Sequence, residues 1–155
     1  MVFRADLREV VLPIPDNWIH DGWIAFLIGA MAPITCIEQP TIQYRQHSQQ
    51  QIGARKLSWQ ATYRLAREVG PAHFRLAYER FKVAYERLCL LAARLPDQSF
   101  LSLAKAKVEH QKRRLAIAES PSRARRVVWS FAELLRGGYS RYSPSWSHVL
   151  KDMLL

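Results

Sequence analysis

Apolar residues recur at steps of three and four along the second half of the chain, the spacing of one helix face. The clearest stripe comprises Phe74, Ala77, Phe81, Ala84, Leu88, Leu91 and Leu95. A second stripe, after the corner at Pro96-Asp97, comprises Leu101, Ala104, Val108, Leu115 and Ala118. Asp97 is a candidate cap for the second helix. The two helices are predicted to form an antiparallel hairpin.

Three further helical patterns accompany this hairpin. One covers about residues 56–69 and is closed by Gly70-Pro71. Another opens at Ser120-Pro121, a cap followed by proline at the first helical position, and ends at Gly137-Gly138. A short helix over about residues 145–155 is predicted to end the chain.

The first third has a mixed pattern. Residues 1–12 form a short amphipathic piece that Pro13-Ile14-Pro15 stops. Residues 23–30 are apolar almost all round, which predicts a buried helix with His20-Asp21 at its first turn and Pro33 at its end. β-branched and aromatic residues at 34–38 and 41–46 then predict two short strands or one bent strand.

These patterns predict a mainly α fold with a short β element in the N-terminal third, followed by a helical bundle or hairpin. With 155 residues, 49% of them hydrophobic, the chain can form one domain over residues 1–155, with an internal seam at residues 53–56. Cys36 and Cys89 have apolar neighbours and no CxxC spacing, so both are predicted to be buried free thiols. No signal peptide or membrane-spanning stretch is recognisable, which predicts a cytoplasmic protein.

Candidate chemistry gathers in two segments, residues 20–23 and 42–47. Asp21 is either a helix cap or a base, and Trp23 is either a core residue or a stacking surface for a sugar. Arg45 can bind a phosphate or remain a solvated charge, and His47 can be a metal ligand or a structural residue. The residues alone leave these alternatives open.

Three segments resemble the C-terminal part of bacterial glycosyltransferase family 2 enzymes, the rhamnosyltransferase-like members in particular. They are Leu12-Pro13-Ile14-Pro15, His20-Asp21-Gly22-Trp23, and Tyr44-Arg45-Gln46-His47 with Gly53. The ending Gly138-Tyr139-Ser140-Arg141-Tyr142-Ser143, with Trp146 and Lys151-Asp152, is also similar to the tail of those enzymes.

The resemblance implies the C-terminal half of a GT-A glycosyltransferase. Such an enzyme transfers a sugar from a nucleotide sugar to a hydroxyl of a glycan or lipid-linked acceptor, with inversion, in cell-envelope polysaccharide synthesis. Asp21 falls on the family's catalytic base, with His20 beside it. Trp23, Tyr44 and Arg45 are implied to line the substrate cleft. His47 is implied to lie near the donor diphosphate or its divalent metal, Mg or Mn.

The chain also departs from the family pattern. His47-Ser48-Gln49-Gln50 stands where the family has His-Gly-x-Asn, and Thr41 replaces a usual leucine. Neither the nucleotide-binding sheet nor its Asp-x-Asp motif is recognisable. We therefore expect residues 1–54 to be an acceptor-side segment and 55–155 a helical C-terminal region. The chain alone is expected to be inactive and to bind no cofactor. A separate N-terminal half, or self-association through the apolar residues 23–30, would complete it.

A non-enzymatic alternative follows from the formal net charge of +10 and the pI near 10.1. A basic helical module would bind an anionic membrane or another polyanion through Lys112, Arg113, Arg114, Arg123, Arg125 and Arg126. No helix-turn-helix, RNP or zinc pattern indicates specific nucleic-acid binding. Residues 136–155 combine aromatic and basic residues, so they either touch lipid at the inner membrane face or cap the helical bundle.

Overall fold

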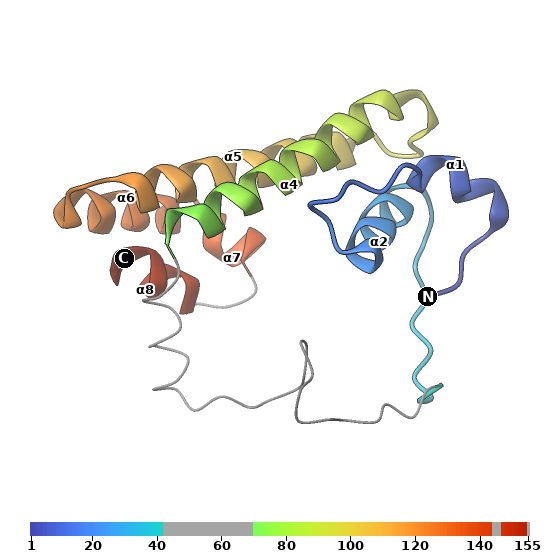
Figure 1. Cartoon of the computed structure of the whole chain (residues 1–155), viewed down its shortest axis with the longest axis horizontal. Coiled ribbons are helices and arrows are strands. Elements are labelled where there is room, and N and C mark those ends of the chain that lie inside the picture. Colours follow the sequence, from blue (N-terminus) through green and yellow to red (C-terminus); the bar gives the residue numbers. More distant parts are fainter. Residues whose placement is uncertain (42–69, 144–146, 155) are drawn as a thin grey trace.

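The computed structural model describes residues 1–41, 70–143 and 147–154, and within these ranges the protein is mainly helical. The long helices α4 (Pro71–Leu90) and α5 (Ser99–Glu119) form an antiparallel pair that spans the molecule (Figure 1). An ion pair of 2.5 Å between Arg75 Nη2 and Glu119 Oε1 joins the start of α4 to the end of α5. The predicted hairpin is confirmed.

The first twelve residues and α2 (His20–Met31) pack near the corner of this hairpin, where η2 (Ala92–Arg94) lies between the two long helices (Figure 1). A 3-10 turn, η1 (Ala5–Leu7), leads into α1 (Arg8–Val11). One core cluster unites these elements, and its buried residues are Val10, Val11, Trp23, Leu27, Ile28, Ala30, Ala84, Leu88, Leu91, Leu95 and Ala104. The apolar face of α2 is therefore covered within the chain.

Arg87 fastens the end of α1 to α4. Its guanidinium donates hydrogen bonds of 2.6, 3.1 and 2.7 Å to the carbonyl oxygens of Glu9, Val10 and Leu12. The last carbonyls of a helix lack partners within the helix, so an arginine at this position satisfies them and complements the helix dipole.

The other end of the hairpin carries α6 (Arg123–Leu135), α7 (Gly138–Tyr142) and α8 (Ser147–Leu154) (Figure 1). The sequence predicted α6 and α8 but not α7. Gly137 follows Arg136, the C-cap residue of α6, and adopts the left-handed conformation with a φ of 72°. This fits the predicted stop of the helix at Gly137-Gly138. The helix α6 begins later than predicted, because Ser122 rather than Ser120 caps it by accepting a hydrogen bond from the Arg125 amide.

The N-cap residue of α5 is Gln98, one position after the predicted Asp97, and it makes no side-chain capping hydrogen bond. The Asp97 carboxylate lies just before the helix and accepts hydrogen bonds from both the amide and the hydroxyl of Ser99. These bonds lower the pKa of Asp97. Pro71 begins α4 after Gly70, whereas the sequence assigned this pair to the end of a preceding helix. That preceding helix, residues 56–69, lies outside the described residues, as does the seam at residues 53–56.

The predicted β element is wrong within the described residues. Residues 34–38 form no strand, and no strand occurs anywhere in the described ranges. Ile34 and Ile37 are 59% and 72% exposed, so their β-branched side chains have no sheet or core to pack on. The second segment, 41–46, lies outside the described residues beyond Thr41.

The prediction of buried cysteines is also wrong, because Cys36 and Cys89 are both exposed free thiols. Cys36 lies in the extended segment after α2, and Cys89 lies in the last turn of α4 on its outer side. For Cys89, apolar neighbours in sequence did not place the thiol in the core, because helix geometry sends adjacent side chains to different faces.

Leu27 offers a test of the core around α2, since its side chain has no exposed surface. We expect Leu27→Ala to lower the free energy of unfolding by about 2–5 kcal/mol, the usual cost of truncating a buried leucine. The matched control is Leu90→Ala on α4, because Leu90 is 79% exposed and should cost at most about 0.5 kcal/mol. Urea denaturation measures both, and equal losses would contradict the packing of α2.

Candidate functional site

His20 and Asp21 lie in the first turn of α2, where the sequence predicts them. The helix begins after Ile19, which is extended and offers no side-chain cap. His20 Nε2 lies 2.8 Å from Asp21 Oδ1, and both side chains are 69% exposed. A carboxylate in the first turn is favoured by the helix dipole. Within the described residues Asp21 makes no capping hydrogen bond, and its exposed carboxylate lies against His20.

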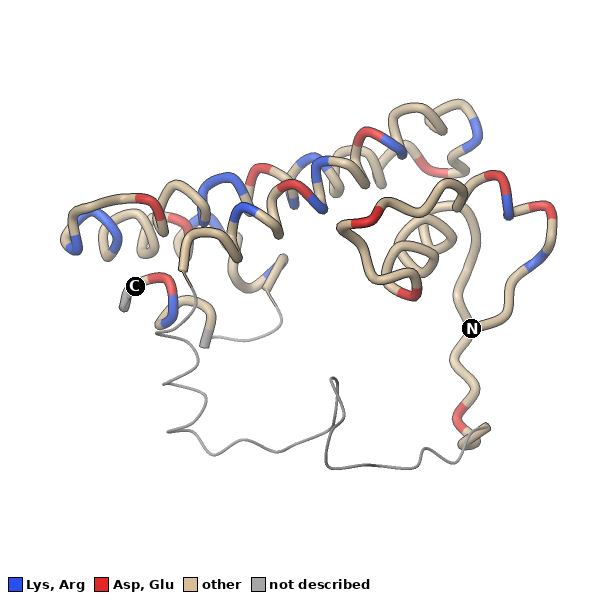
Figure 2. Tube along the Cα trace, viewed as in Figure 1, with Lys and Arg blue, Asp and Glu red and all other residues tan. Residues whose placement is uncertain are grey.

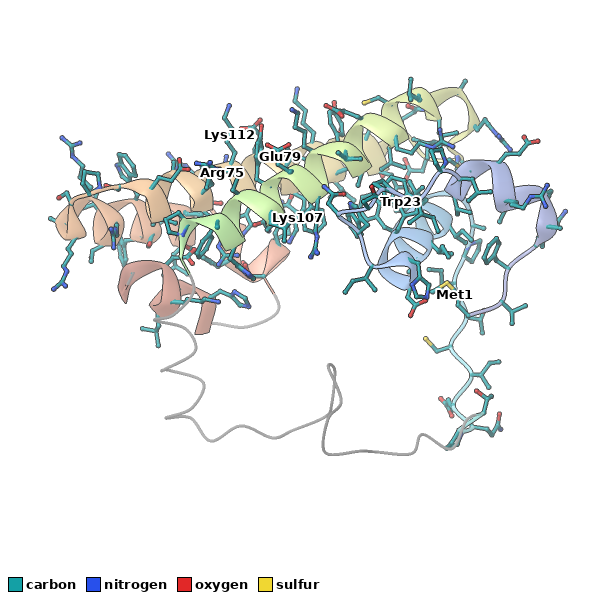
Figure 3. All side chains as sticks on the ribbon, viewed as in Figure 1. Met1, Trp23, Arg75, Glu79, Lys107 and Lys112 are labelled. Carbon is teal, nitrogen blue, oxygen red and sulfur yellow. The ribbon has the colours of Figure 1, made fainter. Side chains whose placement is uncertain are left out.

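Trp23 occupies the core. Its side chain is 1% exposed, and its indole nitrogen donates a 2.7 Å hydrogen bond to the Val11 carbonyl. Trp18 lies beside it, with ring centroids 5.6 Å apart, and donates to the Arg80 carbonyl at 2.9 Å. Neither face of Trp23 is free for a sugar, so its position fits the core alternative. Figure 3 shows Trp23 between α2 and the long hairpin.

Tyr44, Arg45 and His47 lie outside the described residues, so their implied roles in the cleft and at the diphosphate remain predictions. Among the residues that the structure does describe, no group of three His, Cys, Asp or Glu side chains could hold a metal ion.

The sequence did not predict a buried polar network at the other end of the hairpin. His110 on α5 and Glu133 on α6 have 0% and 1% of their surface exposed. His110 Nδ1 lies 2.7 Å from Glu133 Oε1, and Arg113 Nε lies 2.5 Å from Glu133 Oε2. Burial opposes ionisation of Glu133, but the hydrogen bonds from Arg113 and His110 hold its pKa below the usual value. Glu133 is thus a buried carboxylate.

Gly138 makes room for this contact. A Cβ at Gly138 would lie 2.0 Å from Glu133 Oε1 and 2.8 Å from His110 Nδ1. Both distances are too short for a carbon atom, so no side chain fits at this position. The backbone of α7 therefore presses against the Glu133 carboxylate, and only glycine permits it.

A second buried group joins α5 to α8. Arg114 donates two hydrogen bonds to Asp152, of 2.6 Å from Nε and 2.8 Å from Nη2. The Tyr139 hydroxyl donates to Asp152 Oδ2 at 2.7 Å, and burial together with Asp152 raises the pKa of Tyr139. The guanidinium also lies over the ring of Phe74, 5.1 Å from its centroid. These groups satisfy one another, so we interpret both clusters as supports for the packing of α6, α7 and α8.

The pKa of His110 is lowered, because burial outweighs the opposing effect of Glu133. The neutral ring, with its proton on Nδ1, donates to Glu133 and can accept from the Ser143 hydroxyl, 3.2 Å from Nε2. Burial also lowers the pKa of His73 and His148.

The lowered pKa values of these buried histidines make the free energy of unfolding depend on pH. Below about pH 6.5 the unfolded histidines bind protons that the folded ones do not, so acidification must destabilise the fold. We expect the urea midpoint to fall between pH 7.5 and 5.5. His110→Gln should lose less stability than wild type over the same interval. A midpoint that rises on acidification would contradict the buried neutral histidines.

Comparison with models of protein families, with curated proteins and with solved structures finds no match for this chain.

Proposed function

We propose that the chain is the acceptor-side, C-terminal portion of an inverting glycosyltransferase that takes its sugar from a nucleotide sugar. The acceptor is a hydroxyl of a cell-envelope glycan or of a lipid-linked glycan. The proposal rests on the resemblance around residues 12–15, 20–23 and 44–47. The observation that supports it is the solvent-open carboxylate of Asp21, paired with His20 at the start of α2.

In the proposed reaction, Asp21 accepts the proton of the acceptor hydroxyl. The hydroxyl oxygen forms a bond to the anomeric carbon as the bond to the donor phosphate breaks, and the electron pair leaves with the nucleotide diphosphate. Attack opposite the leaving group inverts the anomeric configuration. A positioned general base of this kind contributes about 10²–10⁴ to the rate. His20 orients the carboxylate across their 2.8 Å contact.

The fold holds this candidate base on a rigid element. Trp23, two residues beyond Asp21, anchors the first turns of α2 to α1 through its hydrogen bond to the Val11 carbonyl. Trp18 ties the preceding loop to α4. A carboxylate on a helix fixed at both sides is better positioned than one on a loop.

A three-part transfer assay tests the proposal. Labelled nucleotide sugars, rhamnosyl donors included, are incubated with membranes and with this chain, with a polypeptide carrying the nucleotide-binding half, or with both. The segment encoded directly upstream is the first source to try for that half. We expect transfer only when both are present. Robust transfer by this chain alone, or no effect of adding it, would contradict the proposal.

A second candidate function, contact with an anionic membrane, is favoured by the orientation of α6. Its buried face is polar, since Ser130 and Glu133 are 0% and 1% exposed. Its apolar side chains face outward instead, and those that are 43–75% exposed are Val127, Val128, Trp129, Phe131 and Leu135. Basic positions gather where α6 begins, whereas both signs of charge mix along α4 and α5 (Figure 2). An exposed apolar stripe flanked by arginines is typical of helices that lie in a membrane interface.

Three of the six basic residues predicted to bind a polyanion are bound to other groups of the protein instead. Arg114 is buried against Asp152, Arg113 binds Glu133, and Arg126 donates to the Ser120 carbonyl at 2.7 Å. Lys112, Arg123 and Arg125 remain exposed. In the tail, Tyr139 and Val149 are buried, which fits the alternative that these residues cap the bundle. None of the helices in the described ranges is long and apolar enough to cross a bilayer.

Liposome flotation tests this second candidate. We expect binding to vesicles of phosphatidylcholine with one third phosphatidylglycerol, and little binding to pure phosphatidylcholine. Phe131→Ser with Leu135→Ser should lower the partition coefficient about tenfold or more, because two exposed apolar anchors are lost. Leu90→Ser, at an exposed leucine on α4, is the control and should bind as wild type does. Binding unaffected by the α6 substitutions would exclude this face.

A further inference from the structure

A pocket of about 610 Å³ lies between α2, α4, α5 and α7. Ligand pockets of small organic molecules fall within this range of volume. The walls are largely apolar, since Phe26, Phe81 and Leu88 form one part and Phe100, Leu103 and Ala104 another. The rings of Phe26 and Phe81 meet nearly edge to face, with centroids 6.3 Å apart. The pocket can therefore hold a hydrocarbon chain.

One end of the pocket carries positive charge. Lys107 on α5 and Arg141 on α7 both line it. The Lys107 ammonium lies 4.6 Å from the centroid of the Phe81 ring and donates a hydrogen bond to the Tyr142 carbonyl. Figure 3 shows Lys107 on the side of the hairpin that faces α7, and Lys112 on the opposite side.

Lys107 is partly withdrawn from water, and no carboxylate among the described residues balances its charge. In the described part of the chain, none of the ion pairs involves Lys107, and Arg114 adds a second positive charge nearby. Burial, with Arg114, lowers the pKa of Lys107 to about 8, so the side chain is still mainly protonated at neutral pH. A partly desolvated cation without a counterion is costly, and an anion bound beside it would relieve that cost.

We propose that this pocket binds a single-chain anionic amphiphile, with its hydrocarbon chain among the phenylalanine and leucine side chains and its phosphate or carboxylate head at Lys107 and Arg141. The apolar walls account for the chain, and the unpaired cation at the end of the pocket accounts for the charge of the head. This site stands independently of the glycosyltransferase proposal, because it requires neither Asp21 nor a sugar donor.

Isothermal titration of the full chain tests the site, with probes kept below their micelle concentrations. Decyl phosphate is compared with decanol, inorganic phosphate and decyltrimethylammonium. We expect saturable binding of decyl phosphate with one site per chain, and at least about tenfold weaker binding of the other three, because each lacks the chain or the negative head. Equal binding of decyl phosphate and decanol, or of decyl phosphate and phosphate, would overturn the proposal.

Matched variants locate the site. Lys107→Met keeps most of the length of the side chain but removes its charge. It should weaken the binding of decyl phosphate about tenfold or more while leaving the binding of decanol unchanged. Lys112→Met, on the opposite side of α5, is the control and should bind as wild type does. In Leu103→Trp the larger side chain fills the pocket, so binding should be abolished. The fold should be kept, because Leu103 is 48% exposed. Circular dichroism checks each variant.

Leu103→Trp and Arg141→Met keep the test decisive if Lys107→Met does not fold. Arg141 is exposed, so Arg141→Met should not affect folding. We expect this substitution to weaken the binding of decyl phosphate severalfold. Unchanged binding in both Leu103→Trp and Arg141→Met would place the amphiphile elsewhere.

Discussion

Asp152→Asn is expected to destabilise the fold by about 3–5 kcal/mol, the usual cost of breaking a buried ion pair by removing one partner. Asp152 is fully buried, and its two oxygens accept from Arg114 and Tyr139. An asparagine amide would turn N–H donors toward the donors of Arg114. The guanidinium, 7% exposed, would then be a buried charge without a counterion. Urea denaturation at pH 7.5 should show this loss.

Two further variants separate the buried charge from general damage. Glu119→Gln breaks the exposed pair with Arg75, whose side chains are 67% and 39% exposed, and should cost at most about 1 kcal/mol. Arg114→Met combined with Asp152→Leu removes both charges and should be less destabilised than Asp152→Asn. If Asp152→Asn and Glu119→Gln cost the same, the buried pair does not hold α8 to α5.

Asp21→Asn is expected to lower turnover of the reconstituted transferase by about 10²–10⁴-fold. The amide keeps the size of the side chain and can still contact His20, but it cannot accept a proton. The loss should therefore appear in kcat, with the KM for the donor nearly unchanged, because the donor is bound by the other half. Since Asp21 is exposed and makes no capping bond, the melting temperature should hardly change.

Asp16→Asn is the control for this substitution, because Asp16 lies in the same N-terminal segment, outside the motif. It should retain full turnover. Full turnover in the Asp21→Asn enzyme would instead leave Asp21 as an ordinary first-turn carboxylate that favours the start of α2.

Local patterns predicted the two long helices and the corner near Asp97, because these depend on neighbours in sequence. The predicted stripe ran too far, however, since α4 ends at Leu90 and Leu95 lies beyond it. The orientation of α6 could not be predicted in this way. Its apolar residues suggest an inward stripe, yet Glu133 turns inward because His110 and Arg113, 23 and 20 residues away in sequence, bind it. Long-range polar pairing overrides the amphipathic pattern, and no spacing motif reveals it.

The candidate site was predicted in part. Motif and helix pattern placed Asp21 in the first turn of α2, where it lies. The sequence left Trp23 open between core and cleft, and the hydrogen bond to Val11 that secures it in the core depends on tertiary packing. The strand at residues 34–38 failed because β propensity needs a partner strand, which the described part of the chain does not supply. The position of the Lys107 ammonium group in an apolar pocket could likewise not be predicted from the spacing of apolar residues in the sequence.

The most direct test of the central claim, that Asp21 is the base of the transfer, is the rate of the Asp21→Ala enzyme in the presence of added formate. Alanine removes the carboxylate and leaves space for a small one to replace it. We expect a rate about 10²–10⁴-fold below wild type without formate, and a rise with formate concentration that the wild-type enzyme does not show. A wild-type rate for Asp21→Ala without formate would contradict it.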